Sequence, residues 1–429
     1  MAQNHLIQRL TVELDAPDPT TARKKQDEVS LWLKSDVFLR RLSGRLDEVV
    51  PQEMVLQIPR LEIDVTAHNE ADFQAHFIKS LLAKIEQVCQ KSSVETVTAT
   101  TYLHQSVLYF LKYGYLPPTS IQSTSAEIRH FLMGQNADFD LVFWEIFQQQ
   151  LAQNPQMLSR LAAHLGIEQA TAIFCQILKT EVFTLTQWVK NFIQNGIEKQ
   201  LSITTDSELA VWNRLLLDTP TNVLANEEVF RKYLQTKAWN ELQKESAVNQ
   251  DKHQEAHNRN EEVSLFVENA GLVLLTPFFA QLFQALDWTK NNVWRSQMQQ
   301  HQAVRLLDYL AKGTTDGWEH DWTLNKLLCG LPLETVIEQA PPLHPETLQV
   351  TDDLLKAVIN HWTVLKNTSP QGLRNMFLQR KAKLSSQPDG NGWRLQVARK
   401  TEDVLIERIP WGFSVIKLPW MQNILFVEW

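Results

Sequence analysis

The chain has 429 residues, with 41 Lys and Arg against 49 Asp and Glu, and a formal net charge of -8. Hydrophobic residues make up 44% and charged residues 21%, a globular composition that excludes an intrinsically disordered chain. The negative balance argues against nucleic acid as the main partner, because binding to phosphates needs excess positive charge. Only 13 of the 429 residues are glycine, about 3% against a usual share of about 7%. Gly-rich phosphate loops and many all-β folds are therefore not expected.

Three cysteines, Cys89, Cys175 and Cys329, lie far apart in the sequence. This pattern argues against a disulfide scaffold or a thiolate zinc site and fits a reducing cytoplasm. Residues 1–15 lack a basic region followed by an apolar core, so we expect no signal peptide. The most apolar stretch, Ala270–Leu286, is interrupted by polar residues and a proline, and we interpret it as a buried helix rather than a membrane span.

The N-terminal residues 1–93 predict a strand-helix-strand-helix module. Residues 6–14 and 60–65 alternate apolar and polar side chains, which is typical of half-buried strands. Residues 21–50 read as a helix between them. A second helix is expected to begin after Asn69, a good N-cap, because apolar residues then recur at helical spacing as far as Val88.

Residues 94–242 predict a helical domain, since apolar residues recur at intervals of three and four. Residues 243–262 contain almost no large apolar side chain and are interpreted as a polar linker. Residues 263–429 predict a second helical domain that ends in an aromatic-rich β C-terminus. The expected fold is therefore mainly α (α+β): a helical body with small β elements formed by the N-terminal and C-terminal segments.

The C-terminal β elements are expected after a turn at Gly390–Gly392. Four short strands separated by prolines are predicted, at residues 393–397, 404–409, 413–418 and 424–429. The N-terminal and C-terminal strands are candidates for one shared sheet, because neither set alone makes a stable sheet.

Two segments resemble each other. Val107–Gly114 and Ala303–Gly313 are both amphipathic helices followed by a glycine that can adopt the left-handed C-cap conformation. They are either copies of a duplicated module or two ordinary helix ends, and the sequence favours neither.

The sequence evidence for a catalytic or metal site is weak. His253 and His257 have the i, i+4 spacing of a metal pair, but Glu255 is one position late for a zinc protease motif and the segment is linker-like. The cluster of Asp316, Glu319, His320 and Asp321 could form an acid/base or cation site, yet a polar loop anchored by Trp318 and Trp322 is the simpler interpretation. We expect no enzyme activity, no cofactor and no metal.

Cys329 lies near Lys326, which could make its thiol reactive, but a buried cysteine in an apolar helix is more common. We therefore expect Cys329 to be a buried core residue.

The last 22 residues are unusual for a chain end, which is normally frayed and polar. Trp411, Trp420, Phe426 and Trp429 give this segment a large aromatic surface. Such a segment must pack either into its own core, the simpler interpretation, or against a partner. These four residues are the candidate partner-docking residues.

Several blocks of sequence, in a fixed order, resemble the tape measure proteins of contractile injection systems, the phage-tail-like particles of bacteria. The densest group is C-terminal and comprises Leu354–Trp362, Leu365–Ser369, Gly372–Arg374, Phe377–Arg380, Trp393–Val397, Ile409–Gly412, Ile416–Trp420 and Val427–Trp429. Further blocks are Asn269–Leu275 with Pro277 and Phe278, Leu324–Pro332, His5–Ile7 and Arg60–Asp64. Residues 120–240 match poorly.

The resemblance implies a structural or assembly protein without catalytic residues. Its expected partners are the inner tube, baseplate or spike proteins of the particle, with self-association left open and with no nucleic acid and no membrane insertion. The expected role is tape measure or inner-tube assembly component, made in the cytoplasm and present in the particle. The chain lacks the long repetitive helical tract of an ideal ruler, so an assembly chaperone or a cargo or baseplate adaptor that leaves the particle remains the alternative.

Overall fold

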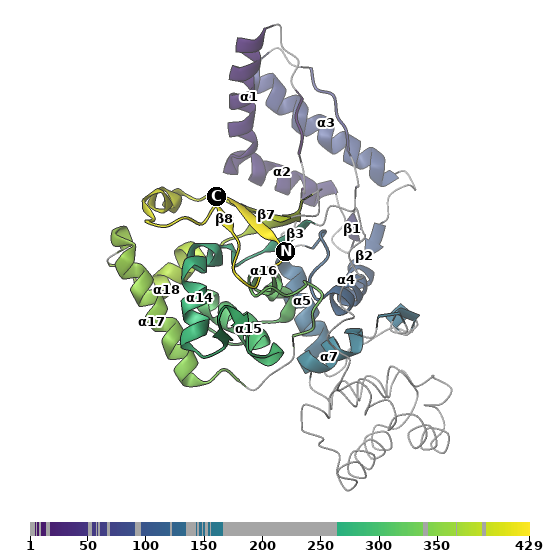
Figure 1. The fold of residues 1–429 in the computed structure, drawn as a ribbon. Helices are drawn as coiled ribbons and strands as arrows, with labels where there is room; N and C mark the ends of the chain where they lie inside the picture. Colours follow the sequence, from purple (N-terminus) through teal and green to yellow (C-terminus); the bar gives the residue numbers. More distant parts are fainter. Residues whose placement is uncertain are drawn as a thin grey trace, which may run out of the picture. The chain divides into compact units, whose positions relative to one another are not determined.

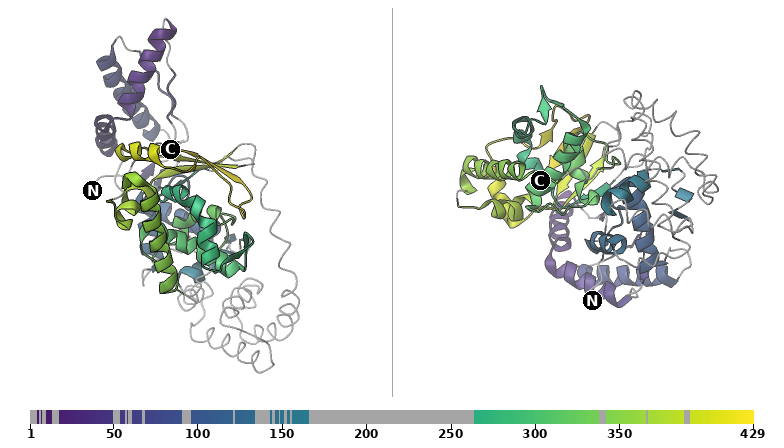
Figure 2. Two further views of the ribbon diagram at one scale, coloured as in Figure 1. Left: turned by 60° about the vertical axis from the view of Figure 1, so that its left-hand side comes forward. Right: turned by 90° about the horizontal axis from the view of Figure 1, so that it is seen from below.

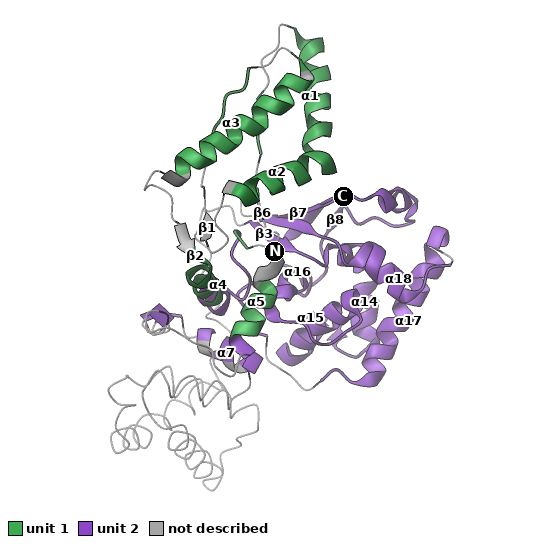
Figure 3. Cartoon of the chain, turned by 180° about the vertical axis from the view of Figure 1, so that it is seen from behind, with its two compact units in different colours: residues 1–107, 119–131 green, residues 108–118, 132–429 purple. Residues whose placement is uncertain are grey.

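The computed structural model describes residues 18–165 and 264–429, apart from short gaps, together with residues 5, 7 and 10–13. The expected linker 243–262, and residues 166–242 of the expected helical domain, lie outside the described residues. The chain divides into two compact units (Figure 3). Unit 1 comprises residues 1–107 and 119–131, and unit 2 comprises residues 108–118 and 132–429. The domain boundaries drawn from the sequence stay a prediction.

Unit 1 is built on three helices, α1 (Pro19–Leu33), α2 (Asp36–Val49) and α3 (Glu70–Gln90) (Figure 1). An aromatic group formed by Trp32, Phe38 and Phe77 joins the three helices. Two short strands, β1 (Met54–Leu56) and β2 (Thr96–Thr98), pair antiparallel. Helix packing therefore provides most of the core of this unit.

The helix predicted at residues 21–50 is two helices, because Ser35 ends one and starts the next. Its hydroxyl donates to the carbonyl of Trp32 and accepts from the amide of Phe38, which is the geometry of an N-cap. The Asn69 cap is confirmed, since Asn69 Oδ1 accepts from the amide of Asp72 at 2.9 Å. Capping residues thus determine where these helices begin.

The strands predicted at residues 6–14 and 60–65 are wrong: the described residues of both segments are not in a sheet. The second segment still places Leu61, Ile63 and Val65 against the core of unit 1. Alternation of side chains reports which face is buried but not whether a partner strand is present. For residues 60–65 the buried face was predicted correctly and the strand was not, whereas Leu10 of the first segment is 48% exposed.

Among the described residues before 166 are the helices α4 (Ala99–Tyr113), α5 (Gln122–Met133) and α7 (Gln156–Leu165). They agree with the predicted helical character of this region. Helices α4 and α5 each continue from unit 1 into unit 2. The end of α4 and all of α7 therefore contribute to the core of unit 2.

Unit 2 contains a five-stranded sheet of order β3-β6-β7-β9-β8. All neighbours are antiparallel except β7 and β9, which are parallel. The strands are β3 (Ser264–Val267), β6 (Ala382–Ser386), β7 (Gly392–Val397), β8 (Val415–Ile416) and β9 (Ile424–Glu428). The strand formed last in the sequence, β9, therefore lies between β7 and β8 rather than at an edge.

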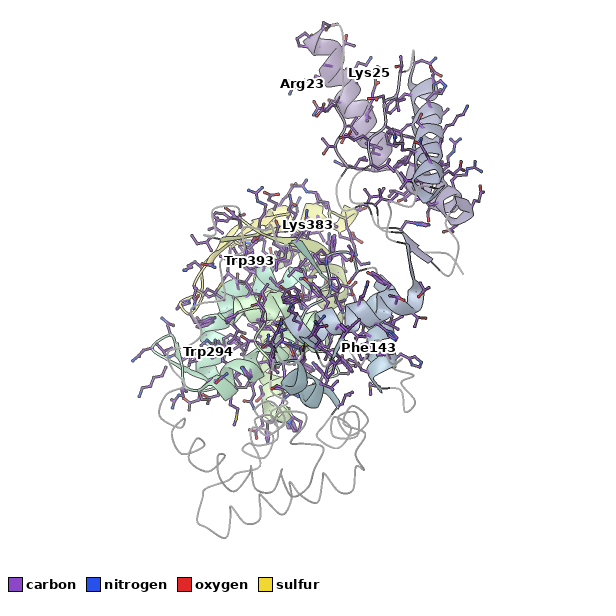
Figure 4. The ribbon with its side chains drawn as sticks, turned by 90° about the vertical axis from the view of Figure 1, so that its right-hand side faces the viewer. Arg23, Lys25, Phe143, Trp294, Lys383 and Trp393 are labelled. Carbon is purple, nitrogen blue, oxygen red and sulfur yellow. The ribbon has the colours of Figure 1, made fainter. Side chains whose placement is uncertain are left out.

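One face of this sheet is covered by helices, which Figures 1 and 2 show beneath the yellow strands. The main helices are α14 (Thr276–Ala285), α15 (Gln297–Lys312), α16 (Thr323–Leu328), α17 (Pro345–His361) and α18 (Pro370–Leu373). Shorter elements are the 3-10 helices η2 (Ala270–Leu275), η3 (Glu319–Trp322), η4 (Thr363–Leu365) and η6 (Thr401–Arg408), the π-helix η5 (Arg374–Leu378), and a hairpin of β4 (Thr289–Lys290) and β5 (Val293–Trp294). Figure 4 labels Trp393, which is buried on the covered face, and Lys383 on the other face.

The fold class is confirmed as mainly α with small β elements from the terminal segments. The shared sheet is wrong for the described residues, because the C-terminal strands pair with β3 and β1 pairs with β2. The predicted strand 404–409 is the 3-10 helix η6, whose start is capped by Asp403: its carboxylate accepts from the amide of Lys400 and from Arg380. The strand predicted at 413–418 shrinks to β8, while 393–397 and 424–429 are confirmed as β7 and β9.

Deleting Trp420–Trp429 should unfold unit 2. The deletion removes β9 from inside the sheet, with the buried Leu425 and Val427, and also the partly buried Trp420. Truncation of one buried leucine alone costs about 2–5 kcal/mol. This is comparable with the total stability of a domain, about 5–15 kcal/mol. Thermal unfolding followed by circular dichroism should show a lower melting temperature than the full chain, and an unchanged melting temperature would show that the terminus is not part of the core.

Candidate functional site

A cluster of buried charges lies in the interior of unit 2, centred on Glu319 of η3. Glu319 Oε1 accepts from Arg160 Nε at 3.0 Å and from Lys326 Nζ at 2.6 Å. All three side chains are 0% exposed. Because an unpaired charge inside a protein costs several kcal/mol, each of these groups depends on the others.

The same two cations also bind backbone carbonyls. Arg160 of α7 donates to the carbonyl of Glu334 at 2.7 Å and to the carbonyl of Leu111 near the end of α4. Lys326 of α16 donates to the carbonyl of Leu333 at 2.8 Å. The cluster therefore connects α4, α7, η3, α16 and the segment at residues 333–334, which are distant in sequence.

Aromatic and imidazole rings surround the carboxylate. His164 lies 3.5 Å from Glu319 Oε2 through its Nε2 atom, and its ring stacks on Trp318 with centroids 4.7 Å apart. Phe110 packs edge-on against His320. These rings fill the space around the charges and keep their environment apolar.

The pKa values of the ionisable groups in this cluster are set by their burial and by the presence of two cations beside one carboxylate. Burial alone would raise the pKa of Glu319, but the charges of Lys326 and Arg160 outweigh it and hold that pKa well below its usual range. Burial lowers the pKa of Lys326 to about 8, and Arg160 adds to this effect although Glu319 opposes it. Burial, followed by the charge of Lys326, also lowers the pKa of His301 to about 4. The charge cluster therefore connects helices, and because the side chains of Arg160, Glu319 and Lys326 are not accessible to solvent, a structural role fits it best.

The structure corrects part of the sequence-based interpretation of residues 316–321. Trp318 and Trp322 are buried anchors, as expected, but Glu319 and His320 are also buried rather than part of a solvated loop. Arg160 and Lys326 were not identified as members of this site. The available signal was a basic residue within an apolar segment in each case, Leu158–Leu161 and Leu324–Leu328.

The four candidate docking residues lie on unit 2. Trp411 Nε1 donates to the carbonyl of Leu274 at 2.8 Å, and Trp420 Nε1 donates to the carbonyl of Leu328 at 2.8 Å. The two indoles thus attach the C-terminal segment to η2 and α16. Both are packed against the core cluster of the unit.

Trp429 and Phe426 differ from these two. The guanidinium of Arg380 lies 5.2 Å from the centroid of Trp429, within cation–π range. Phe426 is 36% exposed and pairs in the sheet with Val415, which is 63% exposed. Phe426 is therefore the candidate docking residue with most surface available, and the docking role itself stays a prediction.

Cys329 and the apolar stretch 270–286 both lie in the core of unit 2. Cys329 is buried, as expected, and burial raises the pKa of its thiol. Residues 270–286 form η2 and α14 in the core, which confirms a buried helical segment. His253 and His257 lie outside the described residues.

Two absences hold for the part of the chain that the structure describes. No group of three or more His, Cys, Asp or Glu side chains could hold a metal ion. No helix there is long and apolar enough to cross a membrane.

Replacing Glu319 with Gln should destabilise unit 2 strongly, because Arg160 and Lys326 would lose their charge partner while remaining buried. Breaking a buried ion pair costs about 3–5 kcal/mol. Glu346→Gln is the matched control, since that side chain is 90% exposed and should cost less than about 0.5 kcal/mol. Chemical denaturation measures both, and equal stability of the two variants would contradict a structural role for the cluster.

The Lys326 ammonium predicts a defined pH dependence. Its pKa in the folded protein is about 8, against 10.5 as the ordinary value, so between these pH values the unfolded chain binds more protons. Stability contributed by this group should therefore rise as pH increases from 8 to 10.5, by about 1.4 kcal/mol per unit of pKa difference. The unfolding free energy of wild type minus that of Lys326→Met should increase across this window. A constant difference would show that the lysine titrates as in water.

Comparison with known proteins gives one match. The family model described as contractile injection system tape measure protein matches residues 4–429, nearly the whole chain. No curated protein and no solved structure matches. Since the match includes both compact units, the chain belongs to the contractile injection system tape measure proteins.

Proposed function

We propose that this protein works in assembly of the inner tube of a contractile injection particle, as a tape measure that is present with the tube. The observation that carries the proposal is the family match over residues 4–429. Assembly in the cytoplasm and direct contact with inner tube, baseplate or spike proteins are parts of the same proposal. An assembly chaperone or adaptor that leaves the particle is the alternative that the experiments below distinguish.

The compactness of unit 2 suggests which part of the chain anchors the protein and which part would measure the tube. Residues 264–429 build one sheet with helices packed on it, and such a body has a fixed size. A tape that measures by length needs a stretch whose extension grows with residue number, about 1.5 Å per residue in a helix. We therefore assign the body at 264–429 to anchoring, and any measuring to the sequence between the two described parts of the chain.

The proposed anchor includes the four C-terminal aromatic residues. Trp411, Trp420 and Trp429 hold the terminal segment on the body, and Phe426 with Val415 presents exposed apolar surface on the strands β9 and β8. Aromatic side chains that are exposed in the free protein and buried in a complex often contribute a large share of the binding free energy. The proposed occupant is a tube, baseplate or spike protein of the same particle.

An insertion tests measurement directly. Ten helical turns, about 36 residues of strongly helical sequence, are inserted between Gln243 and Glu262. A tape measure predicts tubes longer by up to about 54 Å, in steps of the tube subunit spacing. Electron microscopy of purified particles gives the length distribution.

The control is an insertion of equal length placed after Trp429. It should leave tube length unchanged if assembly proceeds. Normal particle yield with unchanged length from the internal insertion would contradict measurement through that segment and favour an adaptor.

Phe426→Ala tests the docking surface. Because the side chain is partly exposed, the variant should keep most of its folding stability but lower the yield of assembled particles. Val404→Ala is the matched control, since Val404 is 62% exposed on η6 of the same body. Normal assembly with Phe426→Ala, at wild-type melting temperature, would show that this side chain does not dock.

A further inference from the structure

Two helices of this chain end in the same way. Helix α4 is followed by Gly114 and α15 by Gly313, with φ of 78° and 81°. In each, the glycine amide donates to the carbonyl four residues earlier, Phe110 or Tyr309, at 2.7 Å. Left-handed glycine caps are common, so this feature alone shows no relationship.

The second shared feature is a buried arginine on the same carbonyl. Arg160 donates to the carbonyl of Leu111, three residues before Gly114. Arg374 Nε donates at 3.2 Å to the carbonyl of Leu310, three residues before Gly313. The two arginines are 0% and 6% exposed. Carbonyls in the last turn of a helix have no partner within the helix, and here a cation satisfies the equivalent one in both.

Each arginine also pairs with a carboxylate. Arg160 Nε lies 3.0 Å from Glu319 Oε1, and Arg374 Nη2 lies 2.6 Å from Asp352 Oδ1. The glycines leave the space for these groups. A Cβ atom at Gly114 would lie 2.8 Å from Arg160 Nη2, and one at Gly313 would lie 3.3 Å from Arg374 Nη1.

The sequence around the two arginines corresponds as well. A Pro-Gln pair precedes each arginine. Pro155 lies five residues before Arg160, and Pro370 lies four residues before Arg374, so the spacing differs by one residue. The glutamines are Gln156 and Gln371. Both glutamines reach the same helix end as the arginine. Gln156 Nε2 donates to the carbonyl of Lys112 at 3.3 Å, and Gln371 Oε1 lies 3.2 Å from the Cβ position of Gly313.

The correspondence extends to buried residues before each proline. Phe143 and Phe147 lie 12 and 8 residues before Pro155, and Val358 and Trp362 lie 12 and 8 residues before Pro370. All four side chains are buried. The glycine and the proline are separated by 41 residues in the first case and by 57 in the second. The longer stretch, between Gly313 and Pro370, contains η3 and α16.

We propose that the described unit 2 residues within 108–165 and within 307–378 are two copies of one motif, and that in each copy the arginine caps the end of the first helix. The second copy carries an insertion containing η3 and α16. The insertion supplies Glu319, the charge partner of the first copy's arginine, so it also joins the two copies. Under this proposal, Val107–Gly114 and Ala303–Gly313 resemble each other because they are copies of a duplicated module and not two ordinary helix ends.

The proposal predicts that each arginine protects its own helix end. Hydrogen exchange measured by mass spectrometry on the full chain should show at least about tenfold faster exchange in peptides covering 108–118 for Arg160→Met, because hydrogen bonds from a charged donor are lost. Peptides covering 307–313 should accelerate at least about threefold less than those covering 108–118, although loss of the cluster also lowers the stability of unit 2 as a whole. Arg374→Met should give the reverse pattern. Arg394→Met is the matched control, since that side chain is half exposed on the sheet, and should change neither helix end.

Gly114→Ala and Gly313→Ala give a second pair of variants if either arginine variant fails to fold. Each should open only its own helix end, because alanine is strained at positive φ and its Cβ approaches the arginine. Equal opening of both helix ends by one variant would show a single structural unit and overturn the proposal. No change at the helix end next to the altered arginine or glycine would overturn it as well.

Discussion

The pairing of Glu319 with Arg160 and Lys326 is the interaction on which the interior of unit 2 depends. Charged groups leave water only when they are paired and hydrogen-bonded, so the elements that carry these three side chains must meet at one point. The backbone carbonyls of Leu111 and Glu334 complete the hydrogen bonds of Arg160. Apolar packing permits many helix arrangements, whereas this set of charges permits few.

The position of β9 is the second constraint. Because β9 lies between β7 and β8, the sheet is complete only when the last residues of the chain are present. Trp411 and Trp420 then attach the terminal segment to η2 and α16 through indole hydrogen bonds. The segment that carries β9 is therefore a structural element of the body, which explains its aromatic and apolar sequence.

The sequence predicted elements whose signal is local and missed those set by distant contacts. The Asn69 cap, the apolar helical segment at 270–286 and strands β7 and β9 follow from residue type and spacing. Strand β3 has four residues inside a helical pattern, too few for periodicity to distinguish strand from helix. The charge cluster could not be predicted, because Arg160 and Glu319 are 159 residues apart and only the folded chain brings them together.

We propose that this member of the tape measure family remains in the assembled particle and is anchored there by its folded C-terminal body. Quantitative mass spectrometry of purified particles, with the inner tube protein as internal standard, tests the claim most directly. A retained tape measure should be found at a fixed, low copy number per particle, independent of purification stringency. Complete particles that lack the chain would contradict the account and identify an assembly factor that departs.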